Sequence, residues 1–197
     1  SSYLVLLDVL DGRRNDISAE KLMKIVQDCQ TDVHDFWSAY FYLHFYTVNT
    51  AKLSENVWKE AEKMLEQIQK YPQKEEYQKL VEADRINLYE REAEKGDDRK
   101  FLEETDRVFK ENLRGDPAWK LYERKLVYLE SKQPDISGEF ERFLKKYPKV
   151  MDAYVEYSIY LCRNNKMTQA QRVYREGRKQ TGMTSKRAEE LRRKLGL

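Results

Sequence analysis

The chain has 197 residues and a net charge of +2; 37% of its residues are charged, 40% are hydrophobic, and only seven are glycine and four proline. This composition excludes disordered, collagen-like and loop-rich sheet proteins, and it favours helices rich in Lys, Glu, Arg and Leu. No stretch approaches the roughly 20 apolar residues of a membrane-spanning helix. Two isolated cysteines, Cys29 and Cys162, fit a reduced, intracellular setting better than a secreted disulfide scaffold.

The first segment, Ser1–Leu10, is apolar but lacks the basic leader and small-residue cleavage site of a signal peptide. It also lacks an initiator methionine, which indicates a piece of a longer protein. A terminal repeat needs a polar outer face to stay soluble. We therefore expect this segment to pack across the first repeat or to be buried in a homodimer.

Apolar residues then recur at helical spacing along the whole chain. Asp16 is predicted to cap the first of these helices, and Ser54 a later one. Gly115-Asp116-Pro117 is predicted to end a helix, because glycine and proline terminate helices. No segment shows the strict alternation or the Asn-Gly turn of a β-hairpin. The bounds are clearest for four predicted helices, at about 54–70, 75–95, 168–179 and 185–195.

Two bulky residues, three positions apart, recur on the first helix of successive helix pairs. The last three of these pairs are spaced by 33 and 35 residues, a period typical of helix-turn-helix solenoids. On the second helices an aromatic residue follows a smaller residue by four positions. Aromatic side chains on one helix need small neighbours on the next, so we expect these residues to pack the repeats. They are Trp37, Tyr40, Ala61, Leu65, Tyr89, Phe109, Trp119, Tyr122, Phe140, Tyr154, Tyr157, Ala170 and Tyr174.

This pattern resembles the half-a-TPR (HAT) repeat, a relative of the tetratricopeptide repeat. The segment Trp119–Pro148 carries the Trp-x-x-Tyr of the family's first helix, and Ala153–Gly177 carries the small residue and the aromatic of its second helix. Gly138 and Gly177, inside second helices, depart from the pattern. The resemblance covers about residues 32–182.

The resemblance implies an all-α fold, a right-handed superhelical α-solenoid of antiparallel helix pairs. The repeats would span about 32–72, 75–116, 117–148 and 149–182, after an N-terminal helical segment at 1–31 and before a basic helix at 183–197. HAT proteins are scaffolds in nuclear RNA-processing complexes, and many dimerise through their repeats. The resemblance therefore implies protein partners of such a complex, nuclear localisation and a homodimer as one alternative.

The charge is unevenly distributed, because residues 163–197 hold eleven Lys and Arg against three acids. An acidic partner or RNA could bind this basic end, although basic terminal helices are also often merely solvated. The candidate binding residues are Arg172, Arg175, Lys179, Lys186, Arg187, Arg192, Arg193 and Lys194.

Signatures of catalysis are missing from the sequence. It has no glycine-rich phosphate loop and no GxSxG, CxxC or HExxH motif. His34 and His44 are ten positions apart and face different sides of a helix, so they form a poor metal pair. We therefore predict no enzyme activity, cofactor, metal, membrane contact or small-molecule substrate. The leading function is a nuclear scaffold, with direct RNA binding or a cytosolic TPR-like peptide adaptor as the alternatives.

Overall fold

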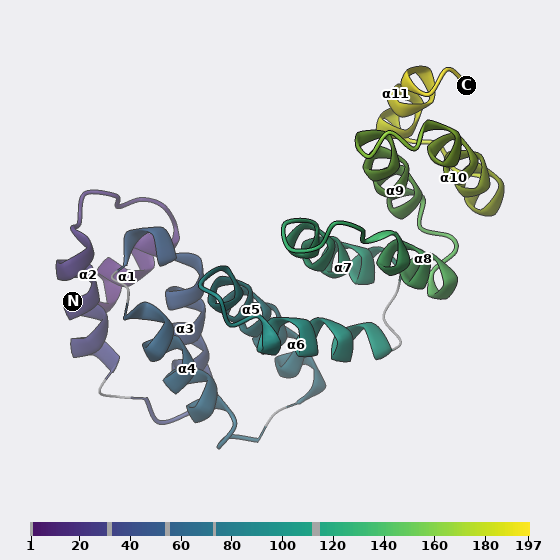
Figure 1. The fold of residues 1–197 in the computed structure, drawn as a ribbon. Coiled ribbons are helices and arrows are strands. Elements are labelled where there is room, and N and C mark those ends of the chain that lie inside the picture. Colours follow the sequence, from purple (N-terminus) through teal and green to yellow (C-terminus); the bar gives the residue numbers. More distant parts are fainter. Residues whose placement is uncertain (1, 31–32, 54–55, 73, 112–114) are drawn as a thin grey trace. The chain divides into compact units, whose positions relative to one another are not determined.

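The computed structural model describes residues 2–30, 33–53, 56–72, 74–111 and 115–197. Within these ranges the chain forms helices and no β-strand, so the all-α prediction is confirmed. No helix in them is long and apolar enough to cross a membrane. The α-helices, in chain order (Figure 1), are α1 (Ser2–Leu10), α2 (Ala19–Cys29), α3 (Phe36–Val48), α4 (Val57–Ile68), α5 (Glu75–Glu94), α6 (Arg99–Lys110), α7 (Gly115–Glu130), α8 (Ser137–Lys146), α9 (Met151–Arg163), α10 (Met167–Thr181) and α11 (Lys186–Lys194).

The chain divides into two compact units, Ser1–Phe101 and Leu102–Leu197, and each unit has its own hydrophobic core. The division falls within α6.

The helix cap predicted at Asp16 is wrong. Ser18, not Asp16, caps α2, and its side chain accepts a hydrogen bond from the backbone N–H of Lys21 at 3.4 Å. The reason is position, since a cap must stand directly before the first helical residue. Ser54 lies outside the described residues, and α4 begins at Val57.

The prediction for Gly115-Asp116-Pro117 is wrong. These three residues form the first turn of α7, and the preceding helix, α6, already ends at Lys110. Proline is tolerated there because the first N–H groups of a helix have no partner within the helix.

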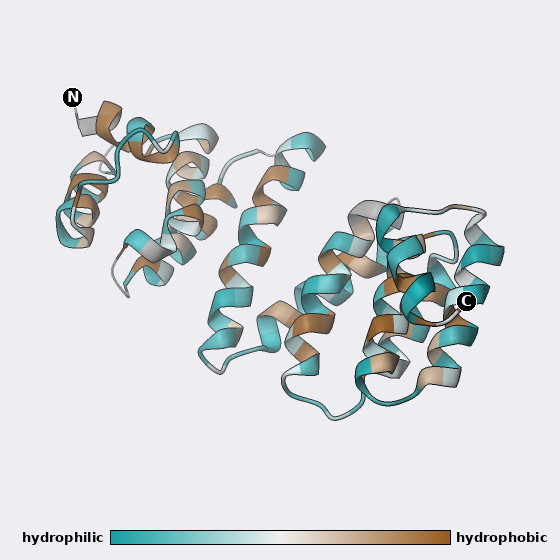
Figure 2. Cartoon of the chain, turned by 90° about the horizontal axis from the view of Figure 1, so that it is seen from above, coloured by the Kyte–Doolittle hydropathy of each residue, from teal (hydrophilic) through white to brown (hydrophobic). Residues whose placement is uncertain are grey.

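In the N-terminal unit, α3 and α4 pack side by side, and α1 lies against α2 and α3. Figure 2 shows α1, beside the N label, as mostly brown, which matches its apolar sequence. Leu6 and Val9 are buried in the core, while Leu4 and Leu7 are exposed. The segment thus packs on its neighbours, and the homodimer stays a prediction.

A polar cluster joins α3 to α5. Asp84 on α5 is 2% exposed, and His44 Nδ1 lies 3.0 Å from its carboxylate. The hydroxyl of Thr47 donates to the same carboxylate at 2.7 Å. The hydrogen bond to Asp84 raises the pKa of His44, although partial burial opposes the change. A carboxylate this deeply buried needs such partners to offset the cost of desolvation.

Replacing His44 with glutamine should make the N-terminal unit less sensitive to pH. Since the folded pKa of His44 is raised, its charge stabilises the fold below the unfolded pKa of about 6.5, and this stabilisation is lost as the pH rises through the folded pKa. Urea denaturation from pH 5.5 to 8.5, followed by circular dichroism, should show a smaller loss of stability across this range in H44Q. A control is H34Q, at a histidine with an exposed side chain; it should behave as wild type, and identical profiles for H44Q and wild type would contradict the prediction.

In the C-terminal unit, α9 and α10 lie side by side (Figure 1), and α7, α8 and α11 each contact α9. Phe143 of α8 is fully buried, and its ring centre lies 5.0 Å from Trp119 and 5.1 Å from Tyr122 of α7. Such edge and tilted contacts between aromatic rings stabilise the fold beyond the area they bury.

A buried lysine ties three helices of this unit together. The side chain of Lys125 on α7 is 5% exposed. Its ammonium donates to Asp106 on α6 at 2.9 Å and to Glu139 on α8 at 3.0 Å. Arg142 donates to Asp106 at 3.1 Å, and the hydroxyl of Tyr122 donates to Glu139.

The residues predicted to pack the repeats are largely inside the two cores. Tyr40 and Tyr89 are half-buried, and Trp37 is 52% exposed with its ring 4.9 Å from that of Tyr77 on α5. Trp37 therefore contacts the following helix pair from the surface. The other ten are buried: Ala61, Leu65, Phe109, Trp119, Tyr122, Phe140, Tyr154, Tyr157, Ala170 and Tyr174.

Candidate binding groove of the C-terminal unit

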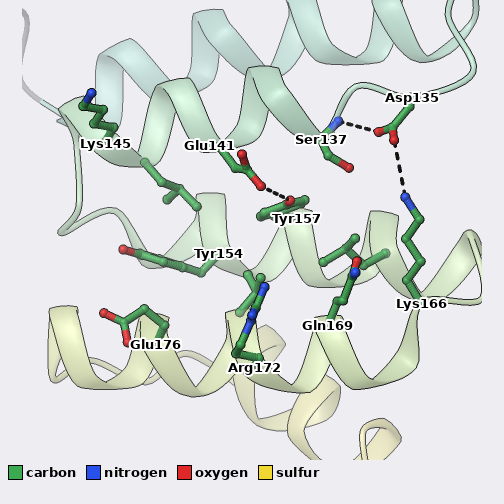
Figure 3. Close-up of a pocket in the computed structure, with 13 residues that line it drawn as sticks. Asp135, Ser137, Glu141, Lys145, Tyr154, Tyr157, Lys166, Gln169, Arg172 and Glu176 are labelled. Atoms are coloured by element: carbon green, nitrogen blue, oxygen red, sulfur yellow. Dashed lines mark hydrogen bonds and ion pairs between the residues drawn. The ribbon is translucent and has the colours of Figure 1, made fainter.

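A groove of about 610 Å³ opens between α8 and α10, with α9 as its floor. Figure 3 shows that α8 and α10 run in the same direction along its two sides and that α9 runs the opposite way. The groove therefore lies between the second helices of two neighbouring pairs. It is lined by Asp135, Ser137, Glu141, Leu144, Lys145, Tyr154, Tyr157, Leu161, Lys166, Gln169, Arg172, Val173 and Glu176.

An ion pair closes one end of the groove. Asp135 accepts a hydrogen bond from the backbone N–H of Ser137 at 2.9 Å, which fixes the chain at the start of α8. Lys166, just before α10, reaches the same carboxylate at 3.4 Å. The hydrogen bonds from Ser137 and the charge of Lys166 lower the pKa of Asp135 to about 2. This carboxylate is thus ionised at neutral pH and already paired with Lys166.

Two tyrosines of α9 form the floor. The ring of Tyr157 stacks on Phe140 at 4.8 Å, and its hydroxyl donates to Glu141 at 3.0 Å. Burial raises the pKa of Tyr157 to about 12, so the hydroxyl stays protonated and able to donate. Tyr154 donates to the carbonyl of Pro148 at 3.2 Å. Both rings are therefore held in place by hydrogen bonds at their hydroxyl ends.

Gly177 sets the distance between α10 and the floor. A Cβ atom at this position would lie 2.6 Å from Cβ and Cγ of Tyr154, closer than real contacts allow. Gly177, one of the two glycines that depart from the repeat pattern, is thus the residue that lets α10 pack directly onto α9.

The polar groups of the groove differ in whether they are already engaged. Glu141 accepts from Tyr157, and Glu176 accepts from Gln180. Within the described part of the chain, Arg172, Gln169 and Lys145 have no hydrogen-bond or ion-pair partner. Figure 3 shows Arg172 and Gln169 pointing from α10 toward α8. The side chains without a partner therefore include two cations, Arg172 and Lys145, while Glu141 and Glu176 keep their negative charge because their donors are uncharged.

The eight basic residues predicted as a binding site are all exposed. Only Arg172 among them lines the groove, so the basic binding site itself stays a prediction. Arg187 forms an ion pair with Glu156, and Arg192 donates to Glu189 at 2.9 Å.

The sequence interpretation missed the other polar residues of the groove. Gln169, Arg172 and Glu176 follow each other at spacings of three and four residues, which places them on one face of a helix. That spacing was a usable signal. Asp135 and Glu141 gave no such signal, because only the packing of α8 against α9 and α10 brings them to the groove.

No protein-family model, no curated protein and no solved structure matches this chain. The resemblance to HAT repeats therefore stays a prediction based on the residue pattern.

Proposed function

We propose that this chain is a non-catalytic scaffold that binds protein partners, with the groove of α8, α9 and α10 as one of its binding surfaces. The observation that carries the proposal is the groove itself, which combines a fixed aromatic floor with a few unsatisfied polar groups. Binding sites typically combine apolar walls with a small number of polar groups that orient the ligand. Arginine and tyrosine are also among the residues enriched at the energetically dominant positions of protein–protein interfaces.

We further propose the setting implied by the HAT-like residues. In this setting the helix pairs form a right-handed superhelical solenoid, and the protein belongs to a nuclear RNA-processing assembly. The repeated residue pattern supports the proposal, together with the burial of Trp119, Tyr122, Ala170 and Tyr174. Small-angle X-ray scattering would test the arrangement of the pairs in solution.

Affinity purification of the full-length protein, followed by identification of its partners, tests the setting. We expect subunits of an RNA-processing complex to co-purify, and an unrelated helical bait serves as the control. Recovery of cytosolic partners alone would support the peptide-adaptor alternative. Recovery of no RNA-processing subunit would remove the nuclear assignment.

Direct RNA binding through the basic end is the second candidate. It is favoured by the exposure of all eight basic residues of α10 and α11 named above. Single-stranded RNA should then bind with an affinity that falls as salt rises, and reversing the charges of Arg172, Arg175 and Lys179 should weaken it further. An affinity unchanged by both would exclude this candidate.

A further inference from the structure

The three acidic and three basic side chains that line the groove cancel in formal charge, and they differ in whether they already have a partner. Asp135 is paired with Lys166, whereas Glu141 and Glu176 accept hydrogen bonds from the uncharged donors Tyr157 and Gln180. Arg172 and Lys145 have no such partner among the described residues. An incoming group that carries negative charge would therefore gain ion pairs without displacing an existing one.

Arg172 is the better placed of the two cations. It points into the groove, whereas Lys145 lies at the end opposite the Asp135–Lys166 ion pair (Figure 3). A guanidinium can bind a carboxylate through two parallel hydrogen bonds, which adds geometric specificity to the ion pair. Gln169, one turn before Arg172 on α10, can donate to a backbone carbonyl of the same ligand.

Apolar surface lies beside these donors. Leu144 of α8, Tyr154 of α9 and Val173 of α10 line the groove. Tyr154 is 5% exposed, and its ring is held by the hydrogen bond to the carbonyl of Pro148. Leu144 and Val173 are half-buried, so they supply the accessible apolar surface beside this ring, which suits an apolar or aromatic side chain of a ligand.

The dimensions fit a short stretch of extended chain. From Ser137 to Lys145 the axis of α8 rises by about 12 Å. An extended peptide advances about 3.3 Å per residue, so about four residues fit along the groove. The groove volume of about 610 Å³ is sufficient for such a segment.

We infer that this groove takes an extended peptide segment of a protein partner, in which a carboxylate side chain pairs with Arg172 and a neighbouring apolar or aromatic side chain packs on Leu144 and Val173, beside Tyr154. The inference rests on the proposed scaffold function and names the chemistry of one partner segment. It places the binding surface between second helices, whereas a TPR-like peptide adaptor would use the faces of its first helices.

Selection of a displayed random-peptide library on the chain tests the inference. We expect the recovered peptides to be enriched in Asp or Glu close to Phe, Tyr, Trp or Leu. The most enriched peptide should then bind at least about tenfold more weakly to R172A than to wild type. A version of this peptide with Asn or Gln in place of the acid should bind wild type more weakly by a similar factor. It should bind R172A with nearly the same affinity as the acidic peptide does, because both changes remove the same interaction.

R175A is the matched control, since Arg175 lies on the same helix, is also exposed and does not line the groove. It should bind the peptide within about twofold of wild type, and both variants should keep the wild-type thermal unfolding. No enrichment, enrichment of basic or uncharged peptides, or equal affinities for wild type and R172A would each overturn the inference. So would an equal loss in R175A, since that would indicate general attraction to the basic surface.

The scaffold function and the peptide-binding inference can be contradicted independently. If RNA-processing subunits co-purify with the full-length protein but the peptide selection fails, the scaffold stands and the inference falls. If acidic peptides bind through Arg172 but no RNA-processing subunit co-purifies, the groove chemistry stands and the proposed setting falls.

Discussion

Replacing Lys125 with alanine should lower the free energy of unfolding of the C-terminal unit by about 3 kcal/mol. The change removes the charge that Asp106 and Glu139 share, and it leaves these carboxylates close together with only Arg142 to balance them. It also leaves a cavity where the buried lysine stem was. Urea denaturation followed by circular dichroism would measure the loss. Lys125→Met keeps most of the stem but not the charge, so it should still show the larger part of this loss in stability.

Lys120→Ala is the control, because Lys120 is an exposed lysine on the same helix. It should change the stability by less than about 0.5 kcal/mol. Equal effects of the two alanine variants would show that the buried network contributes nothing.

The same network predicts an acid dependence. Burial opposes ionisation, but the hydrogen bonds and charges of Lys125 and Arg142 still lower the pKa of Asp106, and with the hydroxyl of Tyr122 they lower the pKa of Glu139. Depressed carboxyl pKa values stabilise the fold above the unfolded pKa of about 4, and this stability is lost as the pH falls through the folded values. Lys125→Ala should therefore flatten the stability profile of the C-terminal unit below pH 5.

Gly177→Ala should destabilise the C-terminal unit by about 1–3 kcal/mol, although alanine is the better helix former by about 1 kcal/mol. The added methyl group would meet Cβ and Cγ of Tyr154 at 2.6 Å. These atoms are at the base of the side chain, so α10 must move away from α9 to relieve the contact. Thermal or urea denaturation would detect the loss, and Gly177→Val should enlarge it.

Gly138→Ala is the matched control on α8, where a Cβ atom would meet nothing within 4 Å. Here the helix preference of alanine acts alone, so stability should rise by up to about 1 kcal/mol. The two substitutions are chemically identical and should have opposite signs. A stabilising Gly177→Ala would contradict the close packing of α10 on α9.

Much of the helical architecture follows from local sequence. The helix predicted at 75–95 is α5 (Glu75–Glu94), and the one predicted at 185–195 contains α11 (Lys186–Lys194). The spacing of apolar residues at about 3.6 positions depends only on nearby sequence, so it predicts a helix without knowledge of the tertiary structure. The ends were less predictable: Pro117 can end one helix or begin the next, and only the surrounding chain decides between the two.

The candidate site was much less accessible to sequence reasoning. The basic C-terminal stretch was evident from composition, but its residues spread over α10 and α11, and Arg172 joins a different set of groups in the groove. Asp84, which holds His44, and Asp106, which pairs with Lys125, are 40 and 19 positions away from those partners. No spacing rule within one helix links residues this far apart.

The sequence alone thus determined that the chain is helical, which helices have an apolar face, and where the aromatic repeat falls, because these properties depend on neighbours within one or two turns. The tertiary structure decided which charges are buried, why Gly177 must be small, and which donors remain unsatisfied between α8 and α10. These depend on contacts between helices, where burial changes the cost of a charge and a single methyl group changes the fit.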